Sequence, residues 1–183
     1  GRDGNSETYT FTQMQKLSAQ FAGFLKAQGI GPGDRVAGLL PRTPELLATI
    51  LGTWRAGAVY QPLFTAFGPK AIEHRLQTSG ARLVVTDGAN RGKLDDVQGC
   101  PAVLTVAGAQ GRGLVRGDFS FWAELDRQPA AFAPVMRTAS DPFLMMFTSG
   151  TTGPAKPLMV PLKAVAAFAG YMRDAVDLRP EDA

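Results

Sequence analysis

Residues 142–156 read PFLMMFTSGTTGPAK, an apolar run that leads directly into four hydroxyl-bearing residues, two glycines and Lys156. The apolar run predicts a buried strand. Glycines let a backbone turn sharply and bring its N–H groups close to phosphate oxygens. Hydroxyl groups donate further hydrogen bonds, and a lysine adds a positive charge on a flexible stem. Because α/β proteins commonly place ligands at the ends of their strands, this stretch predicts a polyphosphate-binding loop that follows a strand.

The spacing within this loop excludes the Walker A type of phosphate loop. That type has four residues between its first Gly and a Gly-Lys pair, which Ser or Thr then follows. Here Gly150 and Gly153 are three apart, and Lys156 stands between Ala155 and Pro157. Composition alone would favour a mobile surface loop as the alternative, whereas the order and spacing of the residues favour a phosphate site.

Outward from this loop, short apolar runs alternate with helical patterns. Strands are predicted at residues 9–11, 35–40, 58–63, 82–86, 102–106 and 142–147. Helices are predicted from Thr12, where Gln15 completes a capping box, from Thr43-Pro44, from Gly68-Pro69 to near Gly80, at 121–127 and at 162–176. Strands separated by helices of this length predict right-handed crossovers. The fold class is therefore α/β, with a mostly parallel sheet flanked by helices.

The helical patterns also predict which side chains are buried. The first helix has Met14, Leu17, Phe21, Phe24 and Leu25 at helical spacing, and the second has Leu46, Leu47, Ile50, Leu51 and Trp54. Each set predicts one face turned toward the core. His74 is the only histidine and falls on a helix that we expect to be exposed, which predicts a solvated side chain.

The bulk composition excludes several classes of protein. Apolar residues make up 45% and charged residues 19%, as in globular proteins, and the net charge of +3 comes without a Lys/Arg cluster that would indicate nucleic-acid binding. Cys100 is the only cysteine, which excludes an intrachain disulfide. No apolar run is long enough to span a membrane. We expect a cytoplasmic protein, although a chain that starts at Gly1 says nothing about a targeting segment.

The order Thr-Ser-Gly-Thr-Thr-Gly, two residues and Lys resembles the signature loop of adenylate-forming (AMP-binding) enzymes, which include acyl-CoA synthetases, luciferases and peptide-synthetase adenylation domains. Other segments stand in the order that this family uses: Tyr9-Thr10-Phe11, Gly33-Asp34-Arg35-Val36-Ala37, Leu40-Pro41-Arg42 with Glu45, Arg55-Ala56-Gly57-Ala58 with Pro62, Ser79-Gly80-Ala81-Arg82 and Asp141-Pro142. The early segments, including Phe67-Gly68-Pro69, are more similar to acetate-like and medium-chain acyl-CoA synthetases than to luciferases.

The resemblance implies an ATP-dependent acid–thiol ligase. Such an enzyme activates a small carboxylic acid as acyl-adenylate, releases pyrophosphate and transfers the acyl group to coenzyme A. By this resemblance, ATP phosphates are held by Thr148, Ser149, Gly150, Thr151, Thr152, Gly153 and Lys156, and Mg²⁺ shares their charge. The implied partners are the acid, ATP and coenzyme A, with no nucleic acid.

The resemblance also implies that residues 1–183 are the N-terminal part of a large adenylation domain. The family's aromatic-Gly-x-Thr-Glu and Thr-Gly-Asp segments and its C-terminal lysine do not occur in the sequence, so no catalytic residue is assigned. We therefore expect the isolated chain to be inactive. We also expect it to expose apolar surface on which copies can associate as a homo-oligomer. A non-catalytic nucleotide-binding or scaffold module that keeps half of the fold is the alternative from another class.

One departure from the family pattern follows the loop. The family usually has Pro-Lys-Gly where this chain has Ala155-Lys156-Pro157. Pro157 has no N–H group and a fixed φ. Any hydrogen bond that relatives make from this position is therefore lost, and we expect the backbone after Lys156 to take a different path.

Overall fold

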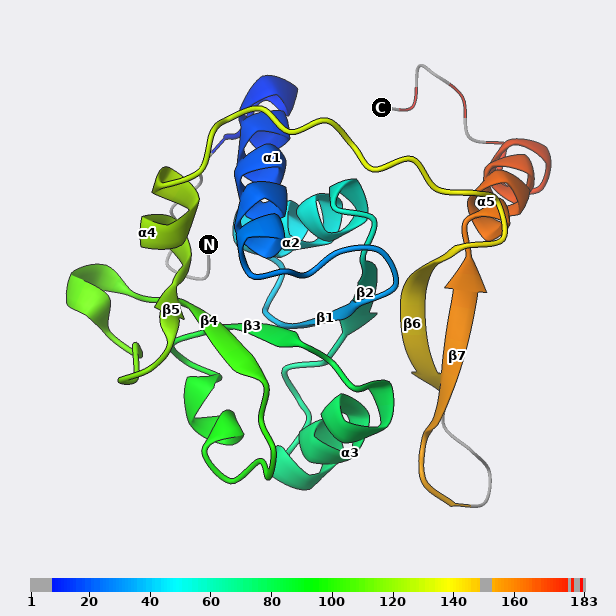
Figure 1. Cartoon of the computed structure of the whole chain (residues 1–183). Helices are drawn as coiled ribbons and strands as arrows, with labels where there is room; N and C mark the ends of the chain where they lie inside the picture. The colour runs from blue at the N-terminus through cyan, green and yellow to red at the C-terminus, as the bar shows by residue number, and fades with distance from the viewer. Residues whose placement is uncertain (1–7, 149–152, 178, 180–181, 183) are drawn as a thin grey trace.

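The structure is a computed structural model that describes residues 8–148, 153–177, 179 and 182. Within this part of the chain, seven strands form one sheet in the order β5-β4-β3-β1-β2-β6-β7, with helices on both of its faces (Figure 1). All neighbouring strands are parallel except β6 and β7. The mostly parallel α/β fold predicted from the sequence is confirmed. No described helix is long and apolar enough to cross a membrane.

The elements have the following bounds. The strands are β1 (Arg35–Leu39), β2 (Val59–Pro62), β3 (Leu83–Asp87), β4 (Ala102–Val106), β5 (Phe119–Ser120), β6 (Pro142–Thr148) and β7 (Lys156–Pro161). The helices are α1 (Phe11–Ala27), α2 (Pro44–Arg55), α3 (Pro69–Ser79), α4 (Phe121–Asp126) and α5 (Lys163–Asp174), with short 3-10 helices η1 (Arg91–Leu94) and η2 (Ala109–Gly111). The sequence did not predict the short strand β5 or the antiparallel strand β7.

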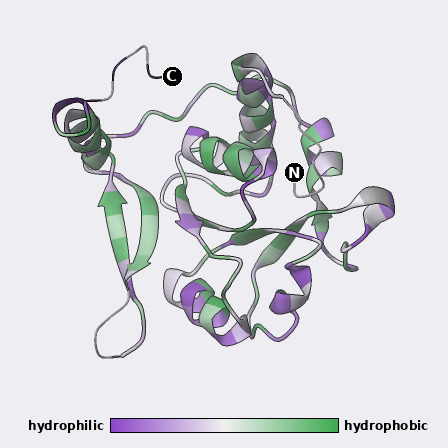
Figure 2. Cartoon of the chain, turned by 180° about the vertical axis from the view of Figure 1, so that it is seen from behind, coloured by the Kyte–Doolittle hydropathy of each residue, from purple (hydrophilic) through white to green (hydrophobic). Residues whose placement is uncertain are grey.

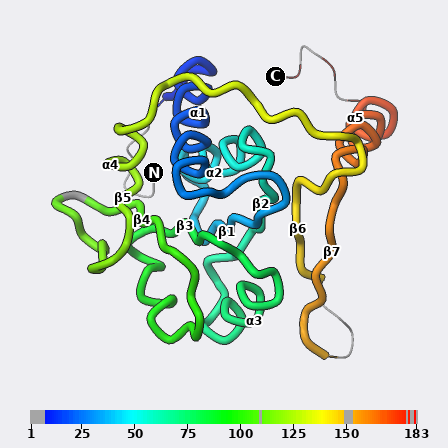
Figure 3. The backbone as a smooth tube through the Cα atoms, in the orientation of Figure 1, coloured from blue at the N-terminus to red at the C-terminus, as the bar shows by residue number. Residues whose placement is uncertain are grey.

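Two hydrophobic layers enclose the central strands. Val36 on β1 faces a cluster built from α1, α2 and α4, whereas its neighbour Ala37 faces a cluster built around Ile72 and Leu76 of α3. Successive residues of a strand point to opposite faces, so one apolar strand serves both layers. Figure 3 shows α3 on one side of the sheet and α1 and α2 on the other.

Helix α1 begins earlier than its predicted start. Thr10 is the N-cap: the Gln13 N–H donates to Thr10 Oγ1 over 3.2 Å, and the Thr10 N–H donates to Gln13 Oε1 over 2.7 Å. The prediction of a strand at residues 9–11 and of a cap at Thr12 is wrong. Thr10-x-x-Gln13 and Thr12-x-x-Gln15 satisfy the same capping-box pattern, and the earlier one gives the helix a longer hydrogen-bond ladder. The predicted apolar face of this helix is confirmed, with Leu17 only partly buried.

Helix α2 turns only part of its predicted face to the core, where Leu46 and Leu51 are partly buried. Its buried residues are Ala48, Thr49, Gly52 and Thr53, whereas Leu47 and Trp54 are 46% and 36% exposed. A Cβ atom added at Gly52 would lie 2.7 Å from Phe21 Cδ1 and 2.8 Å from the Ser18 carbonyl oxygen. Because α1 and α2 approach this closely, only small side chains fit between them. The larger apolar side chains lie to the side of the contact, which periodicity alone does not reveal.

The β6–β7 hairpin and α5 lie to one side of the main body (Figure 1). The connector that leads to them contains no helix or strand between residues 127 and 141, and it is attached to α2 where the Val135 N–H donates to the Arg55 carbonyl over 2.9 Å. Figure 2 shows that both hairpin strands are largely hydrophobic. The exposed apolar side chains of β7 and α5 are Leu158, Met159, Val165, Phe168 and Tyr171. An apolar surface of this kind was expected from the sequence.

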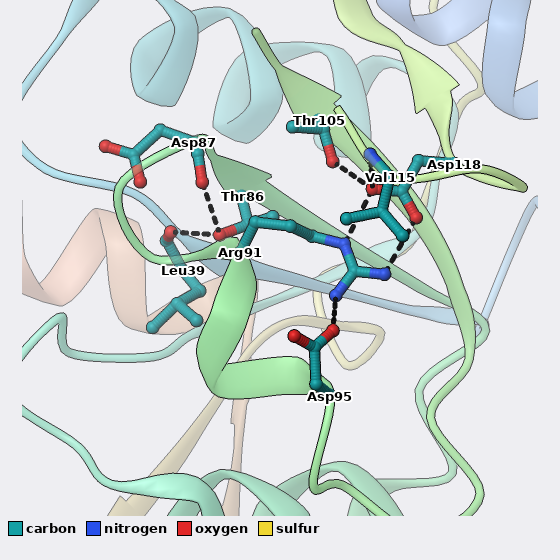
Figure 4. A network of polar contacts seen from close by, with 8 residues as sticks. All are labelled: Leu39, Thr86, Asp87, Arg91, Asp95, Thr105, Val115 and Asp118. Atoms are coloured by element: carbon teal, nitrogen blue, oxygen red, sulfur yellow. Dashed lines mark hydrogen bonds and ion pairs between the residues drawn. The ribbon is translucent and has the colours of Figure 1, made fainter. Parts of the chain in front are cut away.

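A buried ion pair ties the segment after β3 to β5 (Figure 4). Arg91 donates through Nε and Nη2 to the two carboxylate oxygens of Asp118 over 2.6 and 3.0 Å, and Thr105 Oγ1 donates to the same carboxylate over 2.7 Å. The Arg91 and Asp118 side chains are only 11% and 4% exposed. Desolvation raises the pKa of Asp118, but the hydrogen bonds from Arg91 and Thr105 outweigh it, so the pKa lies below its usual value.

We expect Gly52→Ala to lower the free energy of unfolding by about 1–3 kcal/mol, because the added methyl group overpacks the contact between α1 and α2. Gly170→Ala on α5 is the control, since nothing lies within 4 Å of a Cβ atom added there. That change should stabilise the chain by up to about 1 kcal/mol through helix propensity. Urea unfolding of both variants measures the difference. Equal stability of the Gly52 variant and the wild type would contradict the close helix contact.

We expect Asp118→Asn to lower the free energy of unfolding at neutral pH by about 3 kcal/mol, because it leaves a buried Arg91 with only Asp95 as an anionic partner. The folded-state pKa of Asp118 is depressed, so its contribution is complete above the unfolded-state value of about 3.9 and is lost as pH falls through the folded-state value. Urea unfolding should therefore show a smaller difference at acidic than at neutral pH. Asp174→Asn, in an exposed pair with Arg173, should cost less than about 1 kcal/mol.

Candidate functional site

The β6–β7 hairpin brings together the two ends of the predicted phosphate loop. Thr148 ends β6 and Lys156 begins β7, and the two residues are directly opposite in the antiparallel ladder. Thr148 Oγ1 also donates to the Lys156 carbonyl over 3.4 Å. Opposite residues of paired strands place their side chains on the same face. A hydroxyl group and a positive charge therefore lie side by side, both exposed, where the hairpin strands end.

The structure describes three of the seven predicted phosphate-binding residues. Thr148 and Lys156 flank the loop as above, and Gly153 has a φ of +112°, a conformation that L-residues with a side chain rarely adopt. The sequence thus has a glycine where the backbone requires one. The remaining four residues, Ser149, Gly150, Thr151 and Thr152, lie outside the described residues.

Pro157 lies within strand β7, opposite Phe147. Strand β7 is the last strand in the sheet order and has a partner only in β6. An edge strand tolerates proline because one of its sides makes no ladder hydrogen bonds. The backbone after Lys156 therefore continues directly into an extended strand, and the proline is accommodated there.

Helix α3 packs against one face of the hairpin and contacts both of its strands. His74 Nε2 lies 2.9 Å from the Ala155 carbonyl oxygen, and the His74 ring centroid lies 6.2 Å from that of Phe147. The guanidinium carbon of Arg75 lies 4.2 Å from the ring centroid of Phe67 and 5.5 Å from that of Phe147. The prediction of a solvated His74 is wrong, because the side chain is half-buried against the hairpin. The sequence of α3 contains no signal for this contact, which depends on the unpredicted strand β7.

The electrostatics of the hairpin suit an anionic ligand. Lys156 is the only charged residue in β6 and β7, and it forms no ion pair with any described residue. Desolvation lowers the pKa of the nearby Arg75 from its ordinary value, but an arginine remains charged at neutral pH. Among the described residues, no three His, Cys, Asp or Glu side chains gather to hold a metal ion. Mg²⁺ commonly binds through substrate phosphates and few carboxylates, which fits this residue set.

A separate hollow of about 1070 Å³ lies at the carboxyl ends of β1, β2 and β3. Its lining includes Arg42, Tyr60, Phe64 and Asn90, and none of its lining residues comes from β6 or β7. The chain passes from β1 to β2 on one side and then crosses back to β3 on the other side of β1, and α/β sheets typically bind ligands at such a reversal. Burial raises the pKa of Tyr60 above its ordinary value, so its hydroxyl stays protonated at neutral pH and can donate a hydrogen bond.

Known proteins share this fold and much of this sequence. A solved acyl-CoA synthetase structure from Brucella canis is 55% identical with a TM-score of 0.92, and the match covers 98% of this chain and 32% of that one. The acetyl-coenzyme A synthetase of Sodalis glossinidius is 34% identical over 175 residues, which cover 84% of this chain and 26% of the relative. That of Gemmatimonas aurantiaca is 30% identical over 207 aligned positions, covering 100% and 31%.

The chain therefore spans about a quarter to a third of the length of the relatives that it matches. A family model described as AMP-binding enzyme matches residues 2–183, which is nearly the whole chain. This match includes the phosphate-loop segment and every strand of the sheet. The chain belongs to the AMP-binding enzyme family.

Proposed function

We propose that the complete gene product is an ATP-dependent acid–thiol ligase. It activates a small carboxylic acid as acyl-adenylate and then transfers the acyl group to coenzyme A. The substrate class is supported by the relatives, which are named acetyl-coenzyme A synthetase and acyl-CoA synthetase. Within this chain, the segment from Thr148 to Gly153 and the side chain of Lys156 bind the ATP phosphates.

The observation that carries this proposal is the pairing of Thr148 with Lys156 across the hairpin. The ladder fixes the two ends of the Gly/Ser/Thr segment a strand spacing apart, and it places the Thr148 hydroxyl group beside the Lys156 side chain. Such donors stabilise the negative charge that gathers on pyrophosphate as it leaves. The carboxylate of the acid attacks the α-phosphorus of ATP, the bond to the β-phosphate oxygen breaks, and its electron pair leaves with pyrophosphate.

Lys156 has a particular part in this step. Its ammonium group is exposed and has no anionic partner among the described residues, so its charge is available to the leaving β- and γ-phosphates. A lysine on a flexible stem can follow the phosphates as the bond breaks. Mg²⁺ bound to the ATP phosphates would share this charge with Lys156.

We expect Lys156→Ala to slow acyl-adenylate formation by the complete gene product about 10- to 100-fold, because one charge-assisted contact contributes about 1.5–3 kcal/mol. ATP–pyrophosphate exchange at saturating acid measures this step. Lys163→Ala is the matched control, since Lys163 is also exposed and lies at the first residue of α5. An unchanged rate in the Lys156 variant would remove this residue from the mechanism. No exchange by the wild type with any carboxylate would favour the non-catalytic nucleotide-binding module.

We expect the isolated 183-residue chain to form no acyl-adenylate and to bind MgATP poorly. The described site offers contacts to phosphates, and catalysis depends on fixing the carboxylate against the α-phosphate as well. Ordering the loop around a ligand held at one end also costs conformational entropy. Calorimetry with MgATP and pyrophosphate exchange across short and medium carboxylates test both points. Micromolar binding or measurable exchange would show that this chain contains more of the site than we propose.

A further inference from the structure

We infer that His74 is a positioning residue that fixes the backbone immediately before Lys156, so that helix α3 determines where the hairpin presents its lysine. The inference rests on the proposed function, in which Lys156 binds ATP phosphates. It starts from the placement of one half-buried histidine against the backbone carbonyl of Ala155, at the exit of the phosphate loop.

The contact between His74 and Ala155 has a defined direction. A carbonyl oxygen only accepts hydrogen bonds, so the 2.9 Å contact requires a proton on Nε2 of His74. The imidazole ring is oriented by Phe147, whose ring meets it nearly edge to face at an interplanar angle of 71°. The histidine thereby contacts strand β6 at Phe147 and the end of the loop at Ala155, the residue before β7.

The hairpin is held both by the edge of the main sheet and by side chains of two helices. Strand β6 joins β2 through a single residue pair, Tyr60 with Leu144, and β7 is an edge strand in which Pro157 donates no hydrogen bond. At the other end of β6, Trp54 Nε1 donates to the Phe143 carbonyl over 2.8 Å. Side chains from two helices on opposite faces of the sheet thus contact the hairpin, from α2 near its base and from α3 where the loop begins and ends.

Helix α3 is itself held in place by the core and by β2. Ile72 and Leu76 are buried in the second core layer, and Gln61 on β2 donates from Nε2 to the Arg75 carbonyl over 3.2 Å. The Arg75 side chain is held by its own Nη1 contact to the Ala71 carbonyl and lies between the rings of Phe67 and Phe147. A hydrogen bond from this helix therefore fixes the end of the loop relative to the core.

The faces of the hairpin explain how contact on one side orients a residue on the other. Side chains alternate along a strand, so Phe147 faces α3 while its neighbour Thr148 points to the opposite face together with Lys156. Holding Phe147 and Ala155 from behind leaves the functional face open. A displacement of about 1 Å in a positioned group can cost on the order of 100-fold in rate, so the fixed backbone matters for the chemistry.

The test compares His74→Leu with His74→Gln in the complete gene product. Leucine fills space beside Phe147 but has no donor, whereas the glutamine amide places a donor where Nε2 of histidine lies. We expect the leucine variant to raise the KM for ATP and to speed amide exchange of the non-proline residues between 153 and 160, each by about 3- to 10-fold, the range of one net hydrogen bond. The KM for the carboxylate should not change. Thr78→Ala, on an exposed part of α3, is the control.

The glutamine variant should restore both ATP KM and amide exchange to near the wild-type values. A leucine variant that matches the wild type in both measurements overturns the inference, as does a glutamine variant that is as impaired as the leucine one. If leucine prevents folding, the glutamine variant compared with His74→Asn, whose shorter amide cannot reach Ala155, decides the question. If the wild type shows no pyrophosphate exchange, the proposed function fails, and amide exchange still decides whether His74 holds the loop exit.

Discussion

The burial of strand β1 on both faces and both edges is the constraint around which this structure is arranged. β1 pairs with β2 on one edge and β3 on the other, Val36 packs toward α1 and α2, and Ala37 packs toward α3. The backbone N–H and C=O groups of a strand in this position are hydrogen-bonded to a neighbouring strand on each edge. Because these neighbours are parallel, the chain must cross back along one face of the sheet, through a helix, to reach each of them. The loops after β1, β2 and β3 consequently gather at one end of the sheet, around the hollow that includes Arg42 and Tyr60.

The hairpin that carries the candidate phosphate site is attached to this core in a different way. β6 is paired with β2 at Tyr60 and Leu144, and further contacts come from side chains of α2 and α3: Trp54 to Phe143, His74 to Phe147 and Ala155, and Arg75 to Phe147. Elements that bind ligands are commonly among the less strongly held parts of a protein. Here the contacts from α2 and α3 give the hairpin a defined position.

Charged residues in this protein fall into two groups by their surroundings. Arg91 is almost fully buried and forms ion pairs with Asp118 and Asp95. The Arg75 guanidinium group lies close to the rings of Phe67 and Phe147. Both arginines therefore make contacts that stabilise the fold. Lys156 is exposed, lies beside a hydroxyl group and pairs with no acid among the described residues. This contrast separates structural from ligand-binding cations more clearly than residue type does. It supports our proposal that ATP phosphates bind at the hairpin.

The sequence by itself determined the alternation of strands and helices, the glycine at position 153 and the family, because periodicity, turn chemistry and an ordered motif are local properties. It predicted the capping box at Thr12, whereas the structure forms it at Thr10, because both positions satisfy the same local pattern. Only the tertiary structure decided that Gly52 rather than Trp54 lies at the contact of α2 with α1, that Lys156 opens an edge strand, and that His74 contacts the Ala155 carbonyl. Each of these depends on how closely two elements approach in space, and residues far apart in the chain set that distance.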